Sequence, residues 1–172
     1  VAPADLEISS ILRKANKPLL LVVNKADNAK LEADAIEFNE LGIGEPLDNY
    51  DSVIKAIRII NSPHTFNIGA RRITISTSGV IPAIKKLSGE GLQIELSVSL
   101  HAADDKTRSK LMPINKIYPV KDLIAACREY IRKTNRQITF EYVLIKDINS
   151  GLQDALKLSK ILKVPNCKVN LI

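Results

Sequence analysis

Residues 92–102 read LQIELSVSLHA, and this stretch decides between the two architectures that the rest of the chain allows. Its apolar residues occupy every second position and polar residues stand between them, as in a β-strand with two different faces. The apolar positions are Leu92, Ile94, Leu96, Val98 and Leu100, and the polar positions are Gln93, Glu95, Ser97, Ser99 and His101. An open doubly wound sheet needs apolar residues on both faces, whereas a barrel interior accepts Ser, Glu and His near its active-site end. The stretch therefore favours barrel-type packing.

Strand patterns and helix patterns alternate on both sides of this stretch. The predicted strands are 19–23, 71–77, 92–102, 137–145 and 167–172, and the predicted helices are 4–14, 31–41, 51–60, 81–87, 104–112, 120–134 and 152–162. Such alternation indicates repeated βα units and a largely parallel sheet. We therefore expect an α/β fold with five or six strands, either an incomplete TIM-type barrel or, as the alternative, an open doubly wound sheet. A chain of 172 residues is the size of one compact domain.

Composition predicts the cellular compartment of the chain. No apolar run approaches the roughly 20 residues of a membrane span, and the start has no signal-peptide pattern. We therefore expect a soluble, cytoplasmic protein without a membrane partner. The two cysteines, Cys127 and Cys167, are predicted to be buried free thiols. The oligomeric state is left open by the sequence.

Charge is distributed unevenly along the chain. Residues 1–46 hold five Lys or Arg against eight Asp or Glu, which gives −3, and residues 47–172 hold twenty against eleven, which gives +9. A basic segment of this kind suits a polyanionic partner such as rRNA or tRNA. A solvated charged face is the alternative explanation.

A short polar motif follows the first predicted strand, where Asn24, Lys25 and Asp27 form the pattern N-K-x-D. The surrounding stretch, PADLEISSILRKANKPLLLVVNKADNAKLEADAIEFNELGIGEP, resembles part of the Der/EngA ribosome-assembly GTPases. In P-loop GTPases this Asp binds the guanine ring and the Lys packs along the base. The phosphate-binding pattern G-x-x-x-x-G-K-[ST] does not occur in the chain, so GTP hydrolysis is not expected. Guanine-nucleotide binding remains a hypothesis, beside a loop-and-cap role for these residues.

The remainder of the chain, residues 44–172, resembles a different family. The stretches GEPLDNYDSVIKAIRIINSPHTFNIGARRITISTSGVIPAIKKL, LSVSLHAADDKTRSKLMPINKIYPVKDLIAACREYIRKT and ITFEYVLIKDIN are similar to the RlmN/Cfr-type radical S-adenosylmethionine methyltransferases. The resemblance implies an incomplete barrel that binds S-adenosylmethionine and a [4Fe-4S] cluster. It also implies methylation of an adenine at C2 in rRNA or tRNA.

The same resemblance implies where the cofactor would lie. Gly44 and Glu45 match the family's G-E-P element, which contacts the methionine part of S-adenosylmethionine. Ser76 matches a second contact, and the stretch Ser99-Leu100-His101 matches a third. Ser76 and the stretch 99–101 fall near the carboxyl ends of predicted strands, where a barrel gathers its ligands.

The two resemblances meet at Gly44, Glu45 and Pro46, so the sequence predicts a chimera of a GTPase-like piece, 1–46, and a partial barrel, 47–172, packed as one domain. The family's cluster needs three thiolates in C-x-x-x-C-x-x-C, a pattern that this chain does not contain. Methyl transfer by the chain alone is therefore not expected. Three hypotheses follow: a cofactor-binding or RNA-binding methyltransferase core, a guanine-nucleotide binder, and an inactive chimeric scaffold. Residues 36–43, which would form a strand in the methyltransferase, are predicted to be helical.

Overall fold

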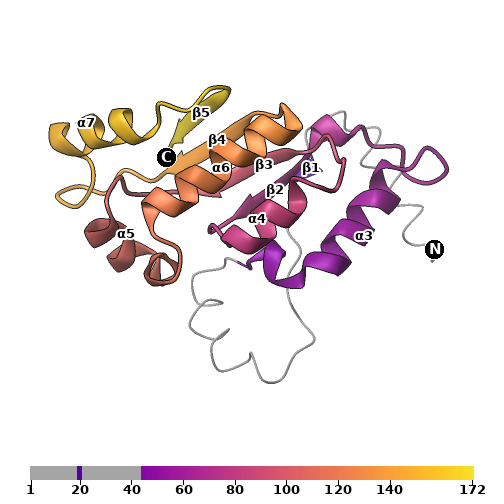
Figure 1. Ribbon diagram of the computed structural model, residues 1–172, viewed down its shortest axis with the longest axis horizontal. Coiled ribbons are helices and arrows are strands. Elements are labelled where there is room, and N and C mark those ends of the chain that lie inside the picture. The colour runs from indigo at the N-terminus through magenta and orange to yellow at the C-terminus, as the bar shows by residue number, and fades with distance from the viewer. Residues whose placement is uncertain (1–18, 21–43) are drawn as a thin grey trace, which may run out of the picture.

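One parallel sheet organises the part of the chain that the structure describes, residues 19–20 and 44–172 of a computed structural model (Figure 1). Its strands are β1 (Leu19–Leu20), β2 (Ile73–Thr77), β3 (Glu95–Ser99), β4 (Ile138–Tyr142) and β5 (Cys167–Leu171). They lie in the order β1-β2-β3-β4-β5, and each neighbouring pair is parallel. A doubly wound sheet reverses its order at a switch point, whereas barrel winding adds each strand beside the previous one. The described strands therefore have the winding of a partial TIM-type barrel, as the sequence predicted.

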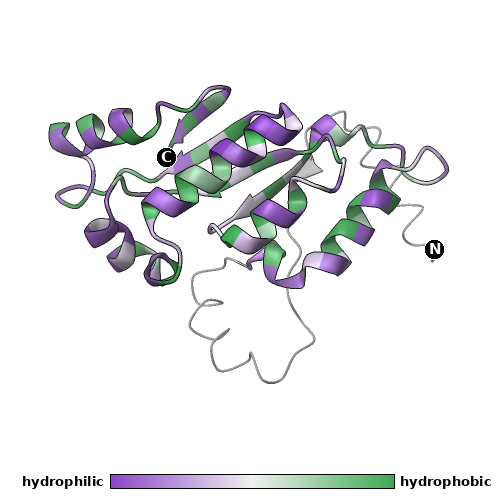
Figure 2. Ribbon diagram, in the orientation of Figure 1, coloured by the Kyte–Doolittle hydropathy of each residue, from purple (hydrophilic) through white to green (hydrophobic). Residues whose placement is uncertain are grey.

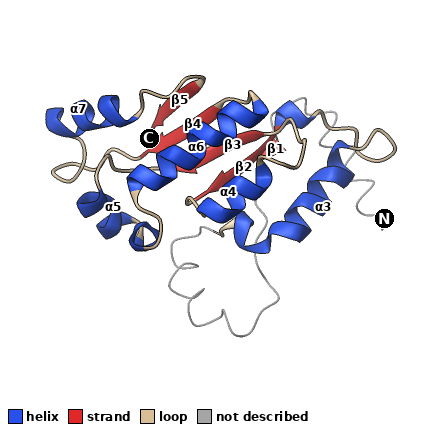
Figure 3. Ribbon diagram, in the orientation of Figure 1, coloured by secondary structure: helices blue, strands red, loops and turns tan. Residues whose placement is uncertain are grey.

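Helices connect the strands, and most of them cover one face of the sheet. They are α3 (Tyr50–Asn61), α4 (Ile81–Leu87), α5 (Asp105–Leu111), α6 (Val120–Thr134) and α7 (Leu152–Ile161), together with 3-10 helices Pro46–Asn49, Ala70–Arg72 and Pro113–Lys116. Figure 3 shows α3, α4 and α6 on the same side of the strands. The predicted helices between residues 51 and 162 are confirmed, with small shifts at their ends.

The hydrophobic core lies between these helices and the sheet. Helix α6 buries one stripe, which consists of Val120, Leu123, Ile124, Ala126, Cys127, Tyr130 and Ile131. Its last turn stops at Asn135, whose left-handed backbone (φ 53°) lets its N–H bond the carbonyl of Ile131. Figure 2 shows polar and apolar residues alternating around α3 and α6, as helices lying on a sheet require. The strands supply Ile73, Ile75, Leu96, Val98, Ile138 and Phe140, each at most 3% exposed.

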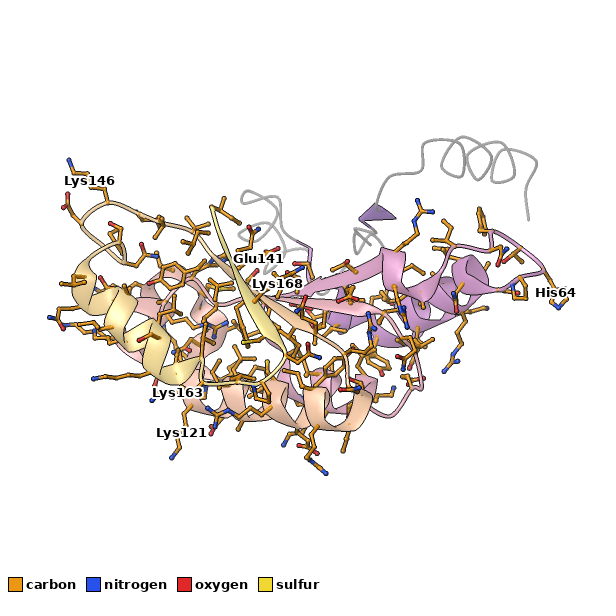
Figure 4. All side chains as sticks on the ribbon, turned by 90° about the horizontal axis from the view of Figure 1, so that it is seen from above. His64, Lys121, Glu141, Lys146, Lys163 and Lys168 are labelled. Atoms are coloured by element: carbon orange, nitrogen blue, oxygen red, sulfur yellow. The ribbon has the colours of Figure 1, made fainter. Side chains whose placement is uncertain are left out.

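The other face of the sheet is polar. Strand register aligns Ser76 with Ser97 and Thr139, and it aligns Ser99 with Glu141. Because aligned residues of parallel strands point to the same side, these side chains share one surface, away from the core. We call it the polar face, and define it as Thr74, Ser76, Glu95, Ser97, Ser99, Thr139 and Glu141. Figure 4 views the molecule from above, with α6 below the strands and Glu141 labelled at the sheet.

Several predicted boundaries differ from the observed ones. The strand predicted at 71–77 begins only at Ile73, because residues 70–72 form a 3-10 helix. The strand predicted at 92–102 is shorter, with bounds Glu95–Ser99, and Gly91 before it has a left-handed φ of 68°. Of the strand predicted at 19–23, residues 19 and 20 are described and pair with β2. The helices predicted at 4–14 and 31–41, and the helical assignment of 36–43, lie outside the described residues. None of the described helices combines the length and apolar character that crossing a bilayer requires.

Candidate functional site

The Glu45 carboxylate joins the Gly44–Glu45 turn to the carboxyl end of β2. Its Oε1 accepts hydrogen bonds from Leu47 N and from Thr77 Oγ1, both at 2.9 Å, so it also caps the 3-10 helix that follows. Its Oε2 accepts from Ser78 N at 2.7 Å and from the Ser78 hydroxyl. Two segments that are 32 residues apart in the sequence are thereby fixed together. Glu45 therefore meets the residues that directly follow Ser76.

Ser76 lies within β2, one residue before this junction. It is half-buried and registers with Ser97 across the sheet, so it belongs to the polar face. Thr77 and Ser78, which the sequence did not single out, donate the hydrogen bonds to the Glu45 carboxylate. Ser76 therefore contributes a hydroxyl to the polar face beside the Glu45 junction.

The stretch 99–101 lies at the end of β3, and its polar contacts are made by main-chain N–H groups and by the His101 ring. The side chain of Leu100 is completely buried in the core, so its main chain alone remains for a polar contact. The N–H groups of Leu100 and His101 both donate to the carbonyl of Glu141, at 3.0 and 3.1 Å. These bonds fix the turn at His101, whose φ of 55° is left-handed.

Hydrogen bonding sets the tautomer of His101. Its Nδ1 accepts the backbone N–H of Val143 at 3.2 Å, so Nδ1 carries no proton. The neutral ring therefore carries its proton on Nε2, which has no acceptor among the described residues. Burial lowers the pKa of His101, and the charge of Arg108 acts in the same direction, while Glu141 opposes them. The ring consequently presents a neutral Nε2–H donor.

Asn149 holds the loop after β4 against His101, a role that the sequence did not predict. Its amide donates to the carbonyls of His101 and Val143, each at 2.7 Å, and its Oδ1 accepts from Ile145 N. Asn149 is 2% exposed, and the Tyr142 hydroxyl donates to its main-chain carbonyl. An Asn in a polar loop is an ordinary turn residue in a sequence, so no pattern marked it out.

Arg108 is the second residue that sequence reasoning missed. Its guanidinium is fully buried and donates to three strand-end carbonyls, those of Ser78 (2.7 Å), Ser99 (3.0 Å) and Leu100 (3.1 Å). It also donates to Asn115 Oδ1 at 3.1 Å. Burial lowers the pKa of Arg108 to about 10, and the side chain stays charged near neutral pH. It connects the carboxyl ends of β2 and β3.

The predicted guanine contacts, Asn24, Lys25 and Asp27, lie outside the described residues, so they stay predictions. The cysteines do not fit an iron-sulfur cluster, because two thiols cannot supply three thiolates. Cys127 is completely buried, and burial raises its pKa to about 12. Cys167 lies at the start of β5, where its thiol contacts the carbonyl of Val164. The predicted free thiols are confirmed, although Cys167 is only partly buried.

Comparison with known proteins identifies related sequences. The family model described as "Radical SAM superfamily" matches residues 11–158. The chain is 52% identical over 132 residues to a probable dual-specificity RNA methyltransferase RlmN of Thermoanaerobacter sp. (strain X514), covering 77% of this chain and 39% of that protein. It is 48% identical over 152 residues to the protein of the same name from Dictyoglomus turgidum, covering 88% of this chain and 44% of the relative. The chain thus spans well under half of these relatives.

A solved structure supports the same assignment. The fold matches the crystal structure of a radical SAM methyltransferase from Sphaerobacter thermophilus with a TM-score of 0.73 and 43% identity, over 83% of this chain and 45% of that one. The family match begins at residue 11, so it also runs through most of the segment predicted to be a GTPase-like piece. The comparisons support the methyltransferase resemblance and give no support to the GTPase or chimera interpretation. The chain belongs to the radical SAM superfamily.

Proposed function

We propose that this chain is the S-adenosylmethionine-binding core of an RlmN/Cfr-type RNA methyltransferase. The observation that carries the proposal is the junction at Glu45, which brings the G-E-P turn to the carboxyl end of β2. Parallel α/β folds bind ligands at that end of their strands. The relatives named as RNA methyltransferases support the same assignment.

The hydrogen bonds suggest how each predicted residue would contribute. The Glu45 carboxylate already accepts hydrogen bonds from three residues, so Gly44 and Glu45 would meet the methionine part mainly through their main chain. Ser76 and Ser99 add hydroxyls on the polar face. His101 would donate from Nε2, whereas Leu100 would line the site between Ser99 and His101, because its main-chain N–H and carbonyl are already bonded within the protein.

Nucleoside binding and the iron-sulfur cluster of the family depend on different residues. A [4Fe-4S] cluster supplies the electron that starts radical chemistry in the family, and this chain lacks a set of thiolates that fits it. We therefore expect cofactor binding without methyl transfer by the chain alone. The inactive scaffold of the third hypothesis differs from this proposal because it would bind no cofactor.

RNA is the partner that we propose for the basic segment. Residues 47–172 carry a charge of +9, and exposed lysines include Lys121, Lys146 and Lys163 (Figure 4). Contacts of Lys and Arg with phosphates weaken as salt rises. A salt-dependent mobility shift with rRNA fragments, absent for a control protein of equal charge, would support RNA recognition. An equal shift with the control protein would contradict it.

Calorimetry tests the cofactor proposal directly. The purified chain is titrated with S-adenosylhomocysteine and, separately, with GDP. We expect saturable heat with S-adenosylhomocysteine, and its loss in Ser76→Tyr, which would fill the polar face. Glu129→Gln, at a half-buried position of α6 that pairs with Lys133 and lies away from the polar face, serves as the control that keeps binding. Heat with GDP alone would favour the guanine-nucleotide hypothesis, and no heat with either ligand would favour the scaffold.

A further inference from the structure

Glu141 is a carboxylate on the polar face that none of the assigned contacts uses. It lies near the carboxyl end of β4, in register with Ser99 on β3 and Asn170 on β5. Ser97 Oγ donates to its Oε1 at 2.9 Å, which orients the carboxylate on the polar face. Figure 4 shows Glu141 at the strands, on the side away from α6.

The second oxygen of Glu141 remains available for a ligand. Oε2 accepts no hydrogen bond from any described residue, and the side chain is half-buried. The other carboxylate of the polar face, Glu95, differs because it forms an ion pair with Arg136. A half-buried carboxylate with an unused oxygen is a strong acceptor for hydroxyl or N–H donors.

The spacing of the strands relates Glu141 to one part of the proposed cofactor. Gly44 and Glu45 sit at β2, where the methionine part is proposed to bind. Neighbouring strands lie roughly 4.8 Å apart, so β4 is about 10 Å from β2. A ligand that runs from the methionine site over β3 and β4 would place its nucleoside beside Glu141 and His101.

We propose that Glu141 accepts hydrogen bonds from the ribose hydroxyls of the nucleoside ligand, while His101 Nε2–H donates beside it. The inference rests on the proposed function, because it assumes that the methionine part lies at Gly44 and Glu45. A carboxylate at a strand end suits a ribose diol, since Oε2 is free to accept one hydroxyl and Oε1 keeps a second lone pair beside its bond from Ser97. Glu141 would thus select ribonucleosides over deoxyribonucleosides.

A cycle of two proteins and two ligands tests the ribose contact. The wild type and Glu141→Gln are titrated with S-adenosylhomocysteine and with its 2′-deoxy analogue. We expect the wild type to bind the ribose ligand about tenfold more tightly than the deoxy ligand. We expect Glu141→Gln to discriminate by about twofold or less, because the charged acceptor is gone while the Ser97 contact can persist. Glu129→Gln, the control on α6, should discriminate like the wild type.

The outcomes separate this inference from the proposed function. Binding of S-adenosylhomocysteine by the wild type, with full discrimination retained in Glu141→Gln, would overturn the ribose contact and leave the proposed function standing. No binding of S-adenosylhomocysteine by the wild type would overturn both. Urea unfolding of each variant shows whether it is folded. If Glu141→Gln does not fold, Ser97→Ala replaces it, because this variant removes the hydroxyl that orients the Glu141 carboxylate. Unchanged discrimination between the two ligands in Ser97→Ala would then overturn the inference.

Discussion

At the scale of single residues, Arg108 illustrates what holds the site together. Its guanidinium spans the carbonyls of Ser78 and Ser99, so the loops after β2 and β3 are fixed to each other. No carboxylate pairs directly with it among the described residues, and backbone dipoles and Asn115 take that place. The buried charge of Arg108 is thus compensated by hydrogen bonds to fixed acceptors, so a side chain of another shape cannot take its place without loss of stability.

Replacement of this residue should be costly. Arg108→Met leaves the carbonyls of Ser78 and Ser99 without the guanidinium donor, so we expect the free energy of unfolding to fall by about 3 kcal/mol. Urea denaturation followed by circular dichroism measures it. Arg132→Met, at an exposed position of α6, is the matched control and should change stability by less than about 0.5 kcal/mol. Equal stabilities of the two variants would show that the hydrogen bonds of Arg108 do not stabilise the fold.

His101 gives the site a dependence on pH. Because burial lowers its pKa from the unfolded value of 6.5, the unfolded chain takes up the proton more readily than the folded chain. Stability from this residue is therefore present above pH 6.5 and decreases as the pH falls below it. We expect the urea midpoint of the wild type to decrease as the pH is lowered from 7.5 to 5.5.

The matched variant for this prediction is His101→Asn. Asn accepts the Val143 N–H through Oδ1 and tolerates the left-handed backbone, yet it does not titrate. We expect a smaller fall of the urea midpoint over the same pH range in this variant. An identical fall in both proteins would assign the pH dependence to other groups.

The family resemblance led to Gly44, Glu45 and His101, and for His101 the end of the alternating strand pattern agreed with it. Arg108 and Asn149 could not be found in this way. Arg108 lies in a short helix beside Lys106 and Lys110, which are exposed, and only the tertiary structure buries it under two strands. A single sequence does not tell a buried arginine from its exposed neighbours.

At the scale of elements, α7 and β5 differ from the rest of the fold. Helix α7 has no fully buried residue, whereas α6 has seven. An ion pair between Lys157 and Asp104 and partial burial of Leu158 attach it to the body. A groove of ≈ 390 Å³ remains between α7 and the strands β4 and β5. Such an element has little apolar contact to resist local opening.

Hydrogen exchange should therefore distinguish the two helices. We expect amides of α7 to exchange faster than those in the middle of α6, because α7 can open without exposing the core. Mass spectrometry of peptides that cover each helix measures the rates. Equal protection of α7 and α6 would mean that α7 opens only with the whole domain.

The sequence predicted the type and order of these elements more accurately than their ends. Periodicity placed α3, α4, α6 and α7 within a residue or two, because each has a clear apolar side or cap signal. It extended the third predicted strand to 92–102, since alternation continues beyond the residues that pair with β2 and β4. Pairing depends on neighbouring strands, which a local pattern does not contain.

At the scale of the whole molecule, the sequential strand order and the polar face distinguish partial barrel winding from a doubly wound sheet. The face is polar because Ser, Thr and Glu occupy the positions that alternate with core residues on β2, β3 and β4. The alternation in 92–102 predicted this face from the sequence. The comparisons give no support to a separate origin of residues 1–46, since the radical SAM match begins at residue 11.

The central claim is that the nucleoside cofactor binds on the polar face at the carboxyl ends of β2, β3 and β4. The most direct measurement is a nuclear magnetic resonance titration of the ¹⁵N-labelled chain with S-adenosylhomocysteine. We expect amide signals of Glu45, Ser76, His101 and Glu141 to shift together, while those of the exposed side of α6 stay unchanged. Shifts confined to α6 or to residues 1–43, or no shifts at saturating ligand, would contradict the claim.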